Sequence, residues 1–157
     1  MLHLKFMCKR YRYQVRRGRD FLHENPRCSR SWSQDCIRRL LKRSDVNVAL
    51  CHQCQFGAES RTDDGGSKLI LKPARFMSNS LYMLKELGKQ CSRQHPHHEL
   101  LGGRAAAAAF YPHRLLTAML RGTARTTEAM HTVQALFQGE YGTQLLTSLQ
   151  GRASPRS

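Results

Sequence analysis

The stretch FLHENPRCSRSW, residues 21–32, contains the pattern that decides how the fold is interpreted. It begins with apolar residues typical of a short β-strand, and the strand ends at Pro26, which cannot continue a sheet. His23, Glu24 and Asn25 stand at the carboxyl end of this strand, where open α/β sheets bind their ligands. The stretch therefore predicts an α/β fold with a polar site at the strand end. The alternative is that Glu24 and Asn25 only cap or brace the turn before Pro26.

Apolar periodicity and breaker residues divide the chain into further elements. The predicted helices cover residues 2–17, 33–43, 80–88, 104–110, 112–122 and 126–138, and the predicted strands cover 21–26, 46–57 and 68–78. The first two strands are joined through a helix, so we expect them to run parallel with a right-handed crossover. The second and third are joined by a polar, glycine-containing loop of about ten residues and form an antiparallel pair. The order predicts a partial Rossmann-like half-sheet with flanking helices.

This order of elements also suggests a division of the chain. We expect one α/β module over residues 1–122, an additional helix over 123–140 and a disordered tail over 141–157.

The chain is strongly basic, with a formal net charge of +15. Residues 1–43 alone carry 13 Lys and Arg against 3 Asp and Glu. Such a surplus suits a polyanionic partner, most plausibly nucleic acid, although it would also fit a solvated basic face. Tyr13 is interleaved with the basic residues and could stack on bases, whereas Tyr11 lies on the apolar stripe and is expected in the core. The residues expected to contact nucleic acid are Arg10, Arg12, Arg16, Arg17, Arg19, Arg38 and Arg39.

The sequence contains neither a membrane span nor a secretory signal. No run of about 18 apolar residues exists, and the N-terminus lacks the unbroken apolar core of a signal peptide. The six cysteines are therefore expected to be thiols or metal ligands in a reducing compartment, the cytoplasm or the nucleus.

Cysteines and histidines of the central region form a second group of candidate site residues. Cys51 and Cys54 make a Cys-x-x-Cys pair, and Cys91 is followed by the histidine-rich stretch 95–98. Zinc prefers four sulfur or nitrogen ligands, which this group could supply. In a strand, however, residues 51 and 54 point to opposite faces. The alternative is that the cysteines are buried as small apolar residues and the histidines lie in a solvated loop.

Five segments between residues 18 and 116 occur in a recognisable order. They are GRDFLHENPRCSRSW, QCQFG, KPARFMSNS, CSRQHPHHELLGG and AAFYPHRLL. Together they resemble a methyltransferase-like module of Copia-type retroelement polyproteins from algae and protists, and the resemblance covers about residues 2–122. It implies the C-terminal half of a class I, DNA-cytosine-type methyltransferase fold, with S-adenosylmethionine as the cofactor of the parent family.

The resemblance also implies roles for particular residues. Glu24 and Asn25 match a Glu-Asn-Val segment at the catalytic rim of cytosine methyltransferases. A carboxylic acid there can protonate a ring nitrogen of the target base, and the amide can hold the geometry of the site. The metal set to which the resemblance points is Cys54, Cys91, His95 and His97.

The chain departs from that family in ways that bear on activity. It has no Pro-Cys pair and no glycine-rich strand-to-helix turn before Glu24, and His52 stands where family members often have Asp. We therefore expect a catalytically incomplete fragment that works with the rest of a polyprotein. The alternatives are a non-enzymatic basic module that binds nucleic acid and is stabilised by zinc, and a reading frame that yields no stable protein.

Overall fold

The computed structural model describes residues 2–62, 65–98 and 110–150, and side chains up to Leu136. Its elements in chain order are α1 (Leu2–Arg16), β1 (Leu22–Pro26), η1 (Arg30–Ser33), α2 (Asp35–Leu41), β2 (Asn47–His52), η2 (Gln53–Phe56), β3 (Glu59–Arg61), β4 (Ser67–Leu69), β5 (Pro73–Ser78), α3 (Leu81–Leu87) and α5 (His113–Gln150). The described part is thus a mixed α/β structure, as predicted, with four α-helices and a small sheet.

The main sheet has three strands in the order β1-β5-β2, and β5 is antiparallel to both neighbours. β1 and β2 therefore run in the same direction, as predicted, but they are not adjacent because β5 lies between them. The antiparallel pairing of the second and third predicted strands is confirmed. The connection between them is not a plain loop, since β3 and β4 form a two-stranded hairpin of their own.

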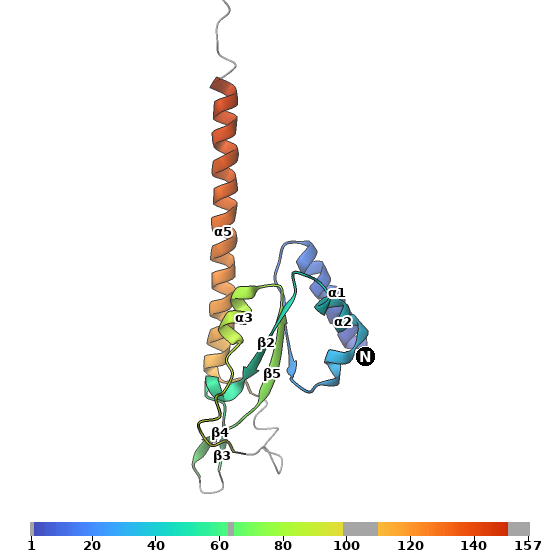
Figure 1. Ribbon diagram of the computed structural model, residues 1–157, viewed down its shortest axis with the longest axis vertical. Helices are drawn as coiled ribbons and strands as arrows, with labels where there is room; N and C mark the ends of the chain where they lie inside the picture. The colour runs from blue at the N-terminus through green and yellow to red at the C-terminus, as the bar shows by residue number, and fades with distance from the viewer. Residues whose placement is uncertain (1, 63–64, 99–109, 151–157) are drawn as a thin grey trace, which may run out of the picture.

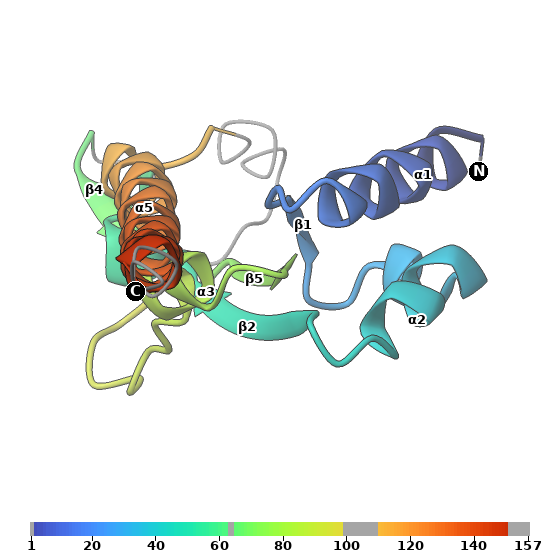
Figure 2. The same ribbon diagram turned by 90° about the horizontal axis from the view of Figure 1, so that it is seen from above.

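Helices cover both faces of the main sheet (Figures 1 and 2). Helices α1 and α2 lie on one face, and α3 and the lower part of α5 lie on the other. Side chains alternate between the two faces of a strand, so β5 contributes to the core on each face of the sheet. Met77 packs in the core beneath α1 and α2, whereas Ala74 and Phe76 pack in the core beneath α3 and α5. One strand thus supplies apolar side chains to two separate cores.

Helix α1 forms where the sequence predicts it, because its apolar residues share one face. Cys8 and Tyr11 are buried on this face, and Leu4 and Val15 pack beside them. The helix ends before Gly18, whose positive φ of 64° favours glycine.

Helix α2 begins later than predicted. The N-cap is Gln34 and not Ser33, because residues 30–33 form the 3₁₀ helix η1. The side chain of Ser29 caps η1, and the indole Nε1–H of Trp32 donates to the carbonyl of Pro26 at 2.9 Å. This bond ties η1 to the end of β1.

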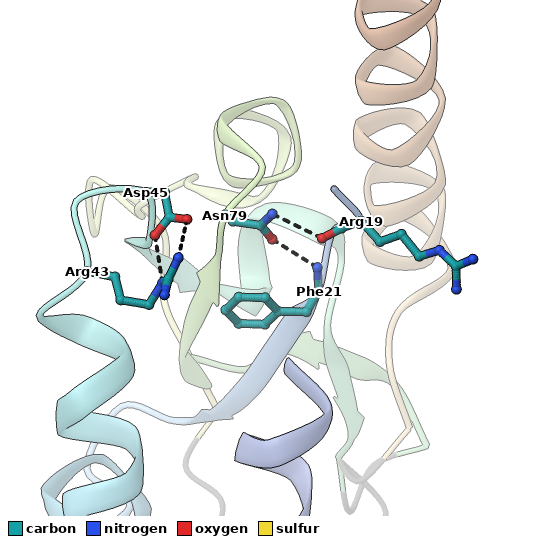
Figure 3. Close-up of polar contacts among 5 residues, drawn as sticks. All are labelled: Arg19, Phe21, Arg43, Asp45 and Asn79. Carbon is teal, nitrogen blue, oxygen red and sulfur yellow. Dashed lines mark hydrogen bonds and ion pairs between the residues drawn. The ribbon is translucent and has the colours of Figure 1, made fainter. Parts of the chain in front are cut away.

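Side-chain hydrogen bonds fix the two connections that lead into the sheet (Figure 3). The Oδ1 of Asn79 accepts from the amide of Phe21 at 3.0 Å, and its Nδ2 donates to the carbonyl of Arg19 at 3.2 Å. After α2, the guanidinium of Arg43 donates to both carboxylate oxygens of Asp45 at 2.8 and 2.7 Å. The first pair of bonds holds the α1–β1 connection against the end of β5.

Helix α5 is one continuous helix and projects well beyond the rest of the molecule (Figure 1). The predicted end near Gly122 and the separate helix over 126–138 are therefore wrong. Gly122 is the point of closest approach to α3, where an added Cβ would lie 2.6 Å from the Cα of Met83. One turn further, the hydroxyls of Ser80 and Thr126 are hydrogen-bonded at 2.6 Å. Packing against α3 thus explains a glycine inside the helix.

Two other predictions fall at the limits of the described chain. Helix α5 includes residues 141–150, which the sequence assigned to a disordered tail. The helix predicted over 104–110 lies outside the described residues except for Phe110, which is in a bend.

Within the described ranges, no helix combines the length and the apolar character that crossing a membrane requires.

Replacing Gly122 by alanine should destabilise the fold even though alanine favours helix by about 1 kcal/mol. The new methyl group would collide with the backbone of Met83, and overpacking of this kind costs about 1–3 kcal/mol. The difference between the two terms predicts that the free energy of unfolding falls by up to about 2 kcal/mol in chemical denaturation. The exposed neighbour Thr123→Ala should change it by no more than about 0.5 kcal/mol. A Gly122→Ala chain more stable than the original would contradict the close approach.

Candidate functional site

Four ligand-type side chains meet at one end of the main sheet. Cys54 comes from η2, whereas Cys91, His95 and His97 come from the segment that follows α3. Their ligand atoms all lie within 4.8 Å of one another; Cys54 is buried and the other three are half-buried. We call these residues the Cys–His cluster. They are the four to which the sequence resemblance points.

The chain path brings the two parts of the cluster together. β5 runs away from the end of β2, α3 brings the chain back, and the amide of His52 then donates to the carbonyl of Lys89 at 2.9 Å. The amide of Cys91 donates to the Nδ1 of His52 at 2.9 Å. The amide of His98 donates to the carbonyl of Leu69 in β4 at 2.7 Å. Both ends of the histidine segment are therefore tied to strands.

The distances within the cluster are close to those of a tetrahedral site. The Sγ of Cys91 lies 3.5 Å from the Nε2 of His95 and 3.6 Å from the Nε2 of His97. Around a tetrahedral zinc with ordinary Zn–S and Zn–N bonds, sulfur and nitrogen are about 3.6 Å apart. The described residues thus contain a Cys₂His₂-type cluster that could bind a metal such as zinc.

The surroundings of the cluster affect its protonation. Burial, followed by the contact with Cys91, raises the pKa of the Cys54 thiol to about 11. Burial and then the charges of His95 and Arg93 lower the pKa of His97, which favours the neutral imidazole that binds metals. The backbone amide of Arg93 donates to the Sγ of Cys91 at 3.2 Å. Such outer contacts orient metal ligands and stabilise a thiolate.

Cys51 does not belong to the cluster, so Cys51 and Cys54 do not act as a ligand pair. Cys51 is fully buried in β2 and packs beside Phe76 in the core beneath α3 and α5. Cys54 lies beyond the end of the strand, in the turn of η2, which Gly57 closes with a φ of 77°. The strand predicted over 46–57 is therefore too long, because it ends at His52, and the two thiols are separated because Cys54 lies in η2 and not because one strand directs them to opposite faces.

Two residues that support the cluster were not identified from the sequence. His52 accepts the hydrogen bond from the amide of Cys91, and its position at the end of a buried strand was the available signal. Arg93 has a positive φ of 63°, which turns its amide toward the sulfur. No sequence pattern indicated this conformation.

Glu24 and Asn25 lie in the last residues of β1, as predicted, and border an open hollow of about 640 Å³. The hydroxyl of Tyr111 donates to the carboxylate of Glu24 at 2.6 Å, and the amide of Asn25 donates to the Nε2 of His23 at 3.0 Å. Burial, and then the bond to Glu24, raise the pKa of Tyr111. Both polar side chains therefore have hydrogen-bond partners within the protein, an arrangement that is compatible with a bracing role as well as with a site.

His23 is a buried residue with both ring nitrogens hydrogen-bonded. Its Nδ1 lies 3.1 Å from the hydroxyl of Tyr11, and its ring packs edge-on against Trp32 with 5.2 Å between centroids. Burial lowers its pKa, so the neutral ring is favoured.

A basic groove separates α1 from α2. It is a hollow of about 480 Å³, and four cationic side chains line it, namely Lys5, Lys9, Arg12 and Arg39. Asp35 is the one carboxylate among the lining residues. Of the arginines predicted to contact nucleic acid, the structure brings Arg12 and Arg39 together here. The sequence prediction did not include the two lysines, although Lys5, Lys9 and Arg12 share one helix face by their spacing; that Arg39 lies opposite them becomes apparent only once α2 lies beside α1.

The other predicted arginines lie around this groove on exposed surface. Arg10 and Arg17 flank the ring of Tyr13, each guanidinium carbon 5.5 Å from the ring centroid. Arg16, Arg19 and Arg38 are exposed near the ends of α1 and on α2. The predicted arginines are therefore exposed or half-exposed on and beside the two helices, and only Arg12 and Arg39 share the groove.

No family model, curated protein or solved structure matches this chain. Its function has to be argued from the chemistry of the Cys–His cluster, the basic groove and the hollow beside Glu24.

The geometry of the Cys–His cluster predicts uptake of about one zinc ion per chain. At a free zinc concentration of about 100 times Kd, binding to the folded chain alone should add about 2.7 kcal/mol to the free energy of unfolding. Cys91→Ser should remove both effects, because it replaces the sulfur shared by the shortest contacts of the cluster. Cys28→Ser, at an exposed cysteine outside the cluster, should remove neither. Chelator-washed protein that takes up no zinc in metal analysis would contradict the assignment.

Proposed function

We propose that this chain is a zinc-stabilised, non-enzymatic module that binds nucleic acid along α1 and α2. The observation that carries the proposal is the groove between these helices, where four cations face one carboxylate. Phosphate groups are the natural partners of such a surface, since Lys and Arg contacts to the backbone dominate nucleic-acid affinity.

The groove cations are available for a ligand. Helix α1 contains no acidic residue that could neutralise them. The ion pairs found among the described residues are Arg43–Asp45 and Arg125–Glu86, and neither involves the groove. Like charges at this spacing repel one another, so the folded chain keeps an unfavourable arrangement that a polyanion would relieve. This favours a binding role over a merely solvated basic face.

The Cys–His cluster supports the non-enzymatic part of the proposal. Four protein ligands fill the coordination sphere of a tetrahedral zinc, which is the pattern of structural sites, whereas catalytic sites keep one position open. The residues that would hold the metal are Cys54, Cys91, His95 and His97. Bound there, zinc would link η2 to the segment after α3 and so close the end of the sheet.

A second candidate function is that of a catalytically incomplete, methyltransferase-like piece of a retroelement polyprotein. The hollow beside Glu24 and Asn25 favours it, because it places a carboxylate and an amide where a base could bind. Two parallel strands joined through α2 also fit half of such a sheet, although β5 lies between them. S-adenosylmethionine would require further residues of the parent polyprotein, since the chain lacks a glycine-rich strand-to-helix turn.

Nucleic-acid binding through the groove should weaken steeply with salt. If each of the four cations neutralises one phosphate, the slope of log K against log salt should be about −3.6 for duplex DNA and about −2.8 for a single strand. Lys9→Ala should make this slope shallower by about 1, because it removes one cation that neutralises a phosphate. Lys68→Ala, on the exposed face of β4, is the matched control and should leave the slope unchanged. Fluorescence anisotropy at several salt concentrations measures this, and binding independent of salt would contradict the proposal.

The second candidate predicts no methyl transfer by this chain alone. Incubation of the purified chain with labelled S-adenosylmethionine and duplex DNA should leave the DNA unlabelled, because neither the methyl-donor turn nor a Pro-Cys nucleophile is present. Labelled DNA, lost again in Glu24→Gln, would show a complete enzyme and overturn both proposals of this section.

A further inference from the structure

Helix α1 presents two different stripes to solvent. Successive residues are about 100° apart around a helix, so Lys5, Lys9 and Arg12 fall together and line the groove toward α2. Phe6 and Tyr13 fall on the neighbouring stripe, directly opposite the buried face of the helix. One stripe is suited to phosphates, and the other carries aromatic rings.

The two rings are exposed to an extent that the core does not require. Phe6 is 57% exposed and Tyr13 is 45% exposed. Tyr11 on the same helix is 7% exposed and stacks on Phe21, with 4.6 Å between centroids. Arg10 and Arg17 lie against the Tyr13 ring. A base that stacks on Tyr13 therefore takes the place of one guanidinium, which can then bind a phosphate.

From these two stripes we infer that the chain prefers single-stranded nucleic acid. Backbone phosphates lie in the groove beside Lys9 and Arg12, and unpaired bases stack on Phe6 and Tyr13. The inference rests on the proposed nucleic-acid binding and names the class of its ligand.

The spacing of the two rings and the side-chain types on α1 both favour single-stranded nucleic acid as the ligand. Phe6 and Tyr13 are seven residues apart, or about 10 Å along the helix, which corresponds to about three stacked nucleotides of one strand. The faces of bases are accessible in a single strand but are covered in a duplex, and exposed rings bind them without sequence preference. Apart from arginine, the aromatic stripe offers no side chain that reads base edges, because it contains no Asn, Gln, Asp or Glu.

A membrane surface is the competing ligand for a basic helix with exposed apolar residues. It is less favoured because the apolar face of α1 is already buried against the sheet and α2. Leu2 and Phe6 are exposed one turn apart on this side of the helix. Lys9 and Arg10 separate them from Tyr13, however, so the exposed apolar surface covers only about one turn of α1.

The test compares a labelled single strand of about 12 nucleotides, of mixed sequence, with the corresponding duplex. Fluorescence anisotropy of the full chain should give at least about fivefold tighter binding to the single strand. Tyr13→Ala should weaken this binding by about 5- to 150-fold, the range found for one lost base–aromatic stack. The same substitution should change duplex binding less than about twofold, and Tyr13→Phe should retain single-strand binding.

Tyr82→Ala is the matched control. Tyr82 is 46% exposed on α3, on the other face of the sheet, and its loss should affect neither ligand. Circular dichroism checks that each variant folds like the original.

The remaining outcomes separate this inference from the proposed function. Equal, salt-dependent binding of both ligands with no effect of Tyr13→Ala would overturn the single-strand preference and leave the groove proposal standing. Absence of binding to either ligand at low salt would overturn both, and binding of anionic phospholipid vesicles in that case would identify α1 as a membrane-surface helix.

Discussion

Strand β5 pairs with both other strands of the main sheet, and the rest of the structure depends on this central position. Phe76 and Met77 are fully buried on its opposite faces, so each core is built around a side chain of the same strand. A shift of one residue in register would turn Phe76 toward α1 and α2 and Met77 toward α3 and α5, so each core would receive a side chain of the wrong size and shape. The register of β5 therefore fixes where α1 and α2, as well as α3 and α5, can pack.

The Cys–His cluster is a consequence of that topology. Because β5 is antiparallel to β2, the chain must return before Cys91 can reach Cys54, and α3 provides the return. Gly88 caps α3, and the bond between His52 and Lys89 then fixes the point at which the segment meets the end of β2. Ligands that are distant in sequence thus meet because of strand order and not because they form a local motif.

Local patterns predicted the elements well, and tertiary contacts explain the failures. The boundaries of α1, β1 and α3 follow from apolar spacing, Gly18 and the N-cap Ser80, all of which act over a few residues. Gly122 suggests a helix end in the sequence, but in the structure it lies inside α5, where its lack of a side chain allows close packing against Met83. The position of β5 could not be predicted either, because a hairpin pattern specifies which strands pair but not which other neighbour a strand accepts.

The candidate sites show the same division between local and long-range information. The four cluster residues were identified through the resemblance, while the pairing of Cys51 with Cys54 suggested by spacing alone is not found. The arginines of the basic surface follow from composition, yet the groove also needs two lysines that only the α1–α2 packing places. In Figure 2 the basic helices and the segment after α3 lie at opposite ends of the molecule. A metal in the Cys–His cluster would therefore act on the groove through the stability of the sheet that supports both, and not by its own charge, which is screened over such a separation.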